Sequence, residues 1–270
     1  MKKNKLSLLF LIISSILLLV SCSNDENNNE SRDVDKDSEN TLVVGSTPTG
    51  PPYTLLNEKS DEMEGIMVEI AEEIGEKLDK EVVIEPMSFD TLIQSLKGDK
   101  IDVISAGMVI TDEREKEINF TDEVFGFGEG LIVHEDTNDI NTYEDLEGKN
   151  VGTQKGTIYH ELLEDSGLPD SIDVYESIGD MLQELSNGRL DAVVADQPVL
   201  VYLEQTNPNF KVKIIDDYEP QIVDGVGLGV AKDNEELLND LNEAIEELKE
   251  EGKLEEIYDE WDVSWDFEDE

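Results

Sequence analysis

The sequence predicts an α/β protein built from two lobes, and three observations lead to this prediction. Short apolar runs typical of strands alternate with segments whose apolar residues recur at helical spacing. The alternation occurs twice, before and after the apolar run 131–133. The 230 residues from Thr41 to the C-terminus exceed the length of a typical single core. We therefore expect two lobes with mostly parallel sheets, covered by helices on both faces.

The expected elements follow one another along the chain. Strands are expected at 42–44, 82–84, 101–104, 131–133, 151–152, 190–195 and 212–215. Helices are expected at 63–78, 92–96, about 157–164, from Ser177 onward, and at 237–258 with a break at Gly252. Asp180 lies three residues after Ser177, which is the spacing of a capping box.

The N-terminal segment has the pattern of a secretory signal. Three lysines precede the apolar run 6–20, which is too short to span a bilayer, so 1–21 are expected to be a signal peptide. The junction LVSC resembles the lipobox of bacterial lipoproteins, in which the cysteine is lipidated. We expect Cys22 to carry the anchor and 22–40 to form a flexible acidic tether. The alternative is an ordinary signal beside a chance cysteine.

Composition excludes several classes of function. The chain has 67 acidic and 20 basic residues, a formal net charge of −47, which argues against binding nucleic acid or anionic lipid surfaces. One cysteine and two histidines argue against a disulfide framework and a metal centre. No metal and no cofactor are therefore expected. Such an acidic surface repels itself at low ionic strength, which predicts a halophilic or salt-tolerant source. The alternative is an acid-rich surface matched to a particular cell envelope.

Six sequence motifs carry a resemblance to a known family. They are VGSTPTGPPY, EGIMVEIAEEIGEKL, KGDKIDVISAGMVITDEREKEINFTDEVF, VGTQKGTI, NGRLDAVVADQPVL and EEGKLEEIYDEW. In this order they resemble the extracytoplasmic amino-acid-binding lipoproteins of ABC importers, solute-binding protein family 3.

The resemblance implies a two-lobed periplasmic-binding-protein-like fold of type II, with two crossover strands forming a hinge. Lobe 1 would comprise 41–131 and 225–270, and lobe 2 would comprise 132–224. The crossovers would lie at 130–134 and 223–230. The implied partners are an amino acid and an ABC permease in the cytoplasmic membrane. A monomer, held outside the cytoplasm at the cell surface or in the periplasm, is expected.

A zwitterionic ligand needs a cation for its carboxylate and an acceptor for its ammonium. Arg114 follows Thr111-Asp112-Glu113 at the start of a predicted helix, and its planar guanidinium can bind a carboxylate with two hydrogen bonds. The alternative is that it pairs with Glu117 or another neighbour. Thr157 can offer its N–H group at a helix N-terminus. Asp196 ends a strand, where open α/β sheets place ligands; the alternative is a helix cap.

The resemblance assigns further roles to single residues. It implies that Asp196 accepts the α-ammonium, that the Gly107 carbonyl contacts the same group, and that Phe89 walls the side-chain pocket. Gly50 stands where relatives often carry a stacking aromatic, so Tyr53 is the nearest ring. Val109 replaces a frequent hydroxyl, and Thr47 replaces an acidic residue common in binders of cationic side chains. The expected ligand-binding set is Arg114, Asp196, Thr157, Gly107, Phe89, Gln154, Val109 and Tyr53.

Two other functions stay open at this point. The sequence has no GxSxG, HExxH or GxxxxGK motif, so catalysis is not expected. The same fold does host a dehydratase of aromatic-amino-acid precursors, which is the enzymatic alternative. A tethered sensor that passes its bound state to a membrane receptor is the second alternative.

Overall fold

The computed structural model describes residues 40–57 and 59–263. The fold below belongs to the compact unit Lys36–Glu270. The signal peptide, Cys22 and the tether predicted from the sequence lie outside the described residues, apart from Asn40. Within the described part, no helix is long and apolar enough to cross a membrane.

The first lobe contains a five-stranded sheet in the order β5-β1-β6-β14-β7. Its strands are β1 (Thr41–Ser46), β5 (Glu81–Pro86), β6 (Val103–Ile104), β7 (Asn119–Phe120) and β14 (Gly229–Val230). β1 runs parallel to β5 and β6, whereas β14 is antiparallel to β6 and β7. Four of the five strands therefore run in one direction, as expected for a mostly parallel sheet, and β14 runs against them because it returns from the other lobe without an intervening helix.

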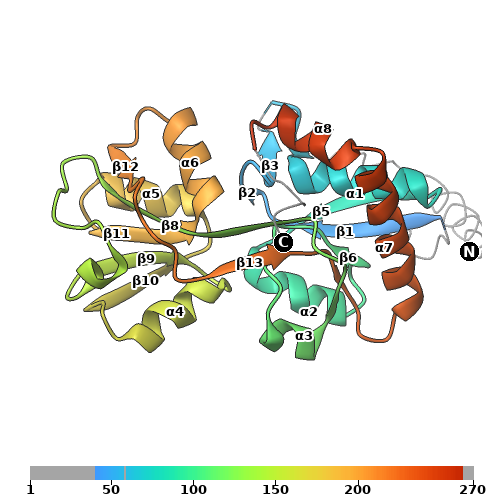
Figure 1. The fold of residues 1–270 in the computed structure, drawn as a ribbon, viewed down its shortest axis with the longest axis horizontal. Helices are drawn as coiled ribbons and strands as arrows, with labels where there is room; N and C mark the ends of the chain where they lie inside the picture. The colour runs from blue at the N-terminus through green and yellow to red at the C-terminus, as the bar shows by residue number, and fades with distance from the viewer. Residues whose placement is uncertain (1–39, 58, 264–270) are drawn as a thin grey trace, which may run out of the picture. The chain divides into compact units, whose positions relative to one another are not determined.

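Helices cover both faces of this sheet. They are α1 (Ile66–Lys77), α2 (Leu92–Lys97), α3 (Asp112–Glu117), α7 (Glu235–Glu250) and α8 (Lys253–Glu260), with the 3-10 helix η1 (Phe89–Thr91) before α2. α1 contacts α7 and α8 and lies on one side of β1, with α2 on the other (Figure 1). Gly252 separates α7 from α8 with φ 71°, as the expected break requires.

A small sheet, β2-β3-β4, precedes α1 and was not predicted. Its strands are β2 (Thr49–Gly50), β3 (Thr54–Asn57) and β4 (Glu62–Glu64). The predicted start of the helix at Met63 is wrong, because Met63 pairs with Leu56 in this sheet. Gly65 sets the boundary with φ 122°, and a Cβ at this position would lie 2.5 Å from the Tyr53 carbonyl oxygen.

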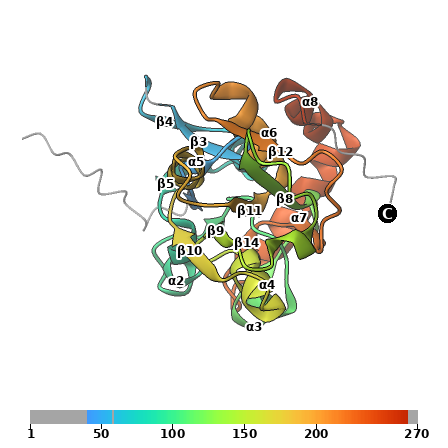
Figure 2. The same cartoon turned by 90° about the vertical axis from the view of Figure 1, so that its left-hand side faces the viewer.

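The second lobe contains a sheet in the order β10-β9-β11-β8-β12. Its strands are β8 (Phe125–His134), β9 (Asn150–Gln154), β10 (Ser171–Tyr175), β11 (Ala192–Asp196) and β12 (Val212–Ile214). The helical elements are η2 (Tyr143–Leu146), α4 (Ile158–Ser166), α5 (Ile178–Ser186) and α6 (Gln197–Thr206). Figures 1 and 2 show α4 and α5 on opposite sides of the strands that both helices contact, β9 and β10.

Two adjacent strands connect the lobes. β13 (Val223–Val226) pairs antiparallel with β8, from Val223 opposite Gly128 to Val226 opposite Phe125. The first crossover therefore lies earlier than the predicted 130–134, because the later half of β8 pairs with β11 and β12 inside the second sheet. The long unbroken strand serves both as crossover and as sheet strand, which a run of apolar residues does not reveal.

Buried side chains fix the crossover region. Tyr53 stacks on Phe125 at 4.5 Å and on Phe127 at 5.4 Å between ring centroids. Glu129, only 1% exposed, accepts hydrogen bonds from the Tyr218 hydroxyl at 2.9 Å and from two backbone N–H groups just before β13. A buried carboxylate with three donors holds the returning chain against β8.

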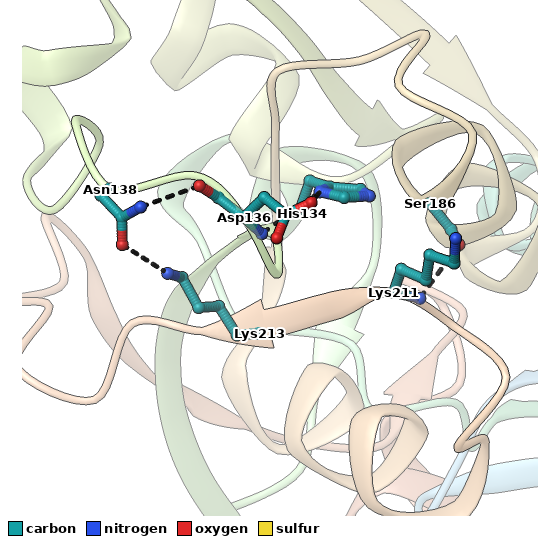
Figure 3. Close-up of polar contacts among 6 residues, drawn as sticks. All are labelled: His134, Asp136, Asn138, Ser186, Lys211 and Lys213. Carbon is teal, nitrogen blue, oxygen red and sulfur yellow. Dashed lines mark hydrogen bonds and ion pairs between the residues drawn. The ribbon is translucent and has the colours of Figure 1, made fainter.

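Polar contacts surround β12, the edge strand of the second sheet (Figure 3). Nδ1 of His134 accepts a hydrogen bond from the Asp136 N–H group at 3.3 Å. Nζ of Lys213 donates to the Asn138 side chain at 3.3 Å, and the Lys211 N–H group donates to Ser186 Oγ at 3.0 Å. The bond to Asp136 gives His134 a structural role. No group of metal-ligating residues occurs in the described part of the chain.

Candidate functional site

A pocket lies between the two lobes. It is lined by Phe89, Gly107, Val109, Arg114, Thr157, Ile158, Tyr159 and Asp196, and encloses about 200 Å³ including its opening to solvent. The first four residues come from the first lobe and the last four from the second. Six of the eight are residues expected to bind ligand, so the structure brings most of the expected set together.

Arg114 enters the pocket from α3. Thr111 caps this helix by accepting the Arg114 N–H group at 3.2 Å, which fixes the backbone that carries the guanidinium. Nη1 donates to the Val109 carbonyl at 2.6 Å, and the guanidinium carbon lies 5.6 Å from the centre of the Phe89 ring. Burial lowers the pKa of Arg114, although the negative charge of Asp196 acts in the opposite direction. The guanidinium is thus held in place by neutral groups.

The alternative role of Arg114 does not hold. Glu117 forms its ion pair with Lys97 instead, and no carboxylate of the described residues lies within ion-pair distance of Arg114. A guanidinium has five N–H donors, and hydrogen bonds within the described residues account for two of them. A buried cation with remaining donors is a site suited to an anion.

Asp196 lies at the carboxyl end of β11, directly before α6. Its carboxylate does not cap the helix; Oδ1 accepts a hydrogen bond from the Tyr159 hydroxyl at 2.7 Å. Burial raises the pKa of Asp196 to about 6, although the Tyr159 hydrogen bond and the positive charge of Arg114 both oppose this rise. The same burial, together with the carboxylate, raises the pKa of Tyr159, which therefore stays a donor.

Thr157 is the N-cap of α4 at the pocket wall. Its hydroxyl donates to the Gln154 carbonyl at 2.8 Å, and its N–H group donates to the same oxygen at 3.4 Å. The side chain of Gln154 itself donates to the Glu176 carbonyl at 3.1 Å, away from the pocket lining. Gln154 therefore shapes the turn into α4 rather than lining the pocket.

Among the other expected residues, some line the pocket and one packs behind its wall. Gly107, with φ 66°, and Val109 both line the pocket, and Val109 also pairs with Val226 of the returning crossover. Tyr53 packs behind Gly107, where a Cβ would lie 3.7 Å from its ring. Tyr53 is thus a supporting residue, and neither it nor Gly50 belongs to the pocket lining within the described residues.

Sequence reasoning missed Ile158 and Tyr159. Both follow Thr157 at the start of α4, and the hydrogen bond of Tyr159 to Asp196, 37 positions later, leaves no pattern in the sequence. Their position directly after Thr157 could have indicated them, because the first residues of a helix that starts at a pocket lie beside that pocket.

Two polar contacts cross from lobe to lobe beside the pocket. Nη2 of Arg114 donates to the Gly156 carbonyl at 3.1 Å, and Nζ of Lys155 lies 2.8 Å from Asp90 Oδ2. The loops touch closely, since a Cβ on Gly156 would lie 2.8 Å from the Asp90 Cα. The lobes are therefore in direct contact on this side of the pocket.

Comparison with known proteins gives the class of this fold and site. Residues 42–263 match the family described as bacterial extracellular solute-binding proteins, family 3, and the chain belongs to this family. The predicted family and the two-lobed α/β fold class are thereby confirmed.

Individual relatives agree with the family. ABC transporter arginine-binding protein 1 of Escherichia coli (strain K12) is 32% identical over 82% of this chain and 90% of its own. A solved structure, an ancestral arginine-binding protein bound to glutamine, is 37% identical over 83% of this chain and 98% of its own, with a TM-score of 0.76. The ancestral amino acid-binding protein AncCDT-1, a precursor of cyclohexadienyl dehydratase, is 27% identical over 82% and 95%, with a TM-score of 0.75.

Proposed function

We propose that this protein captures a free amino acid outside the cytoplasmic membrane and presents it to an ABC permease. One observation carries the proposal: a buried arginine and a half-buried aspartate line the same pocket from opposite lobes. Arg114 offers unused donors, and Asp196 offers an acceptor held by Tyr159. A zwitterion complements such a pair, because its two charges are both matched on leaving water.

The amino acid's carboxylate would lie against Arg114. The guanidinium can bind it with two parallel hydrogen bonds, and the N-terminus of α4 at Thr157 adds a favourable dipole. The ammonium would lie against Asp196, with the Gly107 carbonyl as a further acceptor. Each end of the zwitterion would then be held by at least one charge-assisted hydrogen bond.

The ligand would also favour the closed arrangement of the lobes. Arg114 belongs to the first lobe, while Asp196 and Thr157 belong to the second, so one ligand contacts both. A ligand with extra affinity for the closed state shifts the population toward it. A permease could then distinguish loaded from empty receptor by the closed surface.

The same proposal extends to the N-terminal segment and to the division into lobes. Lipidation at Cys22 would tether a monomeric receptor to the membrane. Its lobes would follow the expected 41–131 plus 225–270 and 132–224, with the first boundary moved back to the part of β8 that pairs with β13. The protein would act without catalysis, as a transport receptor does. The E. coli relative is an arginine-binding protein, which supports an amino acid as the cargo.

Calorimetric titration of the purified protein with each of the twenty amino acids tests this function. We expect one or a few to bind, and Arg114→Ala or Asp196→Ala to weaken that binding by at least about 30-fold. Arg189→Ala is the matched control, because Arg189 is an exposed arginine paired with Glu184. Binding that survives both pocket substitutions would refute the proposed site. Turnover of a bound amino acid, detected by mass spectrometry, would refute the non-catalytic role.

A further inference from the structure

In the proposed complex, the charged side chains of the pocket bind the α-carboxylate and α-ammonium groups of the amino acid. Among the eight lining residues, Arg114 and Asp196 are the ones that carry a formal charge at neutral pH. This step rests on the proposed function, in which Arg114 takes the α-carboxylate and Asp196 takes the α-ammonium. The side chain of the ligand must then be matched by the remaining lining.

That remaining lining is uncharged and largely apolar. Phe89 and Val109 present an aromatic ring and an aliphatic side chain from the first lobe, and Ile158 presents an aliphatic side chain from the second. The hydroxyl of Thr157 already donates to the Gln154 carbonyl, and the hydroxyl of Tyr159 already donates to Asp196. These walls offer dispersion and apolar contact rather than a counter-ion.

At the nearby rim, the acidic residue next to Phe89 is already paired. Asp90 directly follows Phe89, and its carboxylate is paired with Lys155 of the opposite lobe at 2.8 Å. A cationic ligand side chain would have to displace Lys155 to reach Asp90, and an anionic one would have to displace Asp90 to reach Lys155. In this ion pair, the charges of Asp90 and Lys155 at the edge of the pocket already neutralise each other.

We propose that the protein selects an amino acid whose side chain is uncharged, and that Phe89, Val109 and Ile158 form the subsite for that side chain. Burying an ionised side chain against these walls leaves its charge unpaired, which is strongly unfavourable. The pocket therefore discriminates by the charge of the side chain, while the zwitterion supplies the common part of the affinity.

Matched ligand pairs test this selection without knowledge of the natural ligand. Citrulline against arginine, glutamine against glutamate, and norleucine against lysine each compare side chains of similar size that differ in charge. We expect the uncharged member to bind at least about tenfold more tightly in each pair that binds measurably. A charged member that binds as tightly as its partner, or more tightly, would overturn the inference.

A substitution in the subsite gives a second, independent readout. Ile158 is half-buried at the first position of α4, where a glutamate is favourable for the helix. Ile158→Glu should raise the affinity for lysine or arginine relative to Ile158→Gln, which has the same size without the charge. Equal affinities of the two variants for these cations would contradict the assignment of Ile158 to the subsite.

The outcomes also separate this inference from the proposed function. If arginine is preferred and its binding is lost in Arg114→Ala and Asp196→Asn, the amino-acid receptor stands and the charge selection fails. If uncharged ligands bind equally well to both of those variants, the zwitterion site fails, and the inference that rests on it fails as well.

Discussion

The raised pKa of Asp196 makes ligand affinity depend on pH in a range where few other groups titrate. Burial raises this pKa from an ordinary value of 3.8 to about 6 in the free protein. An ammonium bound against the carboxylate stabilises the ionised form, so the pKa of Asp196 falls when ligand binds. Binding must therefore release a proton below pH 6, and affinity must fall as the pH drops.

The size of the effect follows from the titration of one group. At pH 8 Asp196 is ionised, whereas at pH 5 only about one molecule in eleven carries the charge if the pKa is about 6. The dissociation constant should therefore rise about tenfold between pH 8 and pH 5. The α-carboxyl group of the ligand titrates well below this range and leaves the profile unchanged.

Isothermal titration from pH 5 to pH 8, in buffers of different ionisation enthalpy, measures both the affinity and the proton release. Tyr159→Phe removes a hydrogen bond that lowers the pKa of Asp196, so the midpoint of the profile should move to higher pH. Asp196→Asn should bind weakly with no such midpoint. A dissociation constant that stays flat in the unsubstituted protein down to pH 5 would refute the assignment of Asp196 to the ammonium.

Three further predictions concern stability, closure and salt. Because burial raises the pKa of Asp196 in the folded state, its ionisation lowers the free energy of unfolding as the pH rises from about 4 to 6, by up to about 3 kcal/mol. Asp196→Asn should therefore raise the melting temperature of the ligand-free protein at pH 7.5. A lower melting temperature of this variant would contradict the reasoning. Lys155→Met removes the ion pair with Asp90 across the lobes and should weaken ligand binding about two- to fivefold in low salt. The control Lys149→Met breaks a pair with Asp139 within one lobe and should leave the affinity unchanged. Equal effects of the two substitutions would show that the Lys155–Asp90 pair does not support closure. The melting temperature should rise from dilute buffer to about 1 M KCl, where the screening length is about 3 Å, and a constant or falling value would contradict a salt-adapted surface.

Much of the fold could be predicted from the sequence because its strands and helices have regular periodicity. Apolar runs such as 42–44 and 82–84 became β1 and β5, and the break at Gly252 separates α7 from α8. The small sheet before α1 was missed because Thr49–Gly50 and Glu62–Glu64 have no alternating pattern. The first crossover was placed too late because one continuous strand leaves the first lobe and then enters the second sheet.

The candidate site was predictable to the extent that single residues carry unusual chemistry. The positions of Arg114 at a helix start and Asp196 at a strand end suggested this pair, the family resemblance assigned their roles, and both residues do line one pocket. The partnership of Tyr159 with Asp196 could not, since it depends on how α4 faces β11 across 37 positions of sequence. The assignment of Gln154 and Tyr53 to supporting rather than lining positions likewise required the packing around the pocket.

The most direct test of the account is a crystal structure of the protein bound to the amino acid that binds most tightly. The account predicts the ligand carboxylate within hydrogen-bond distance of the Arg114 guanidinium. It also predicts the ammonium within hydrogen-bond distance of Asp196, and an uncharged side chain against Phe89, Val109 and Ile158. A ligand bound outside this pocket, or with its ammonium away from Asp196, would contradict the central claim.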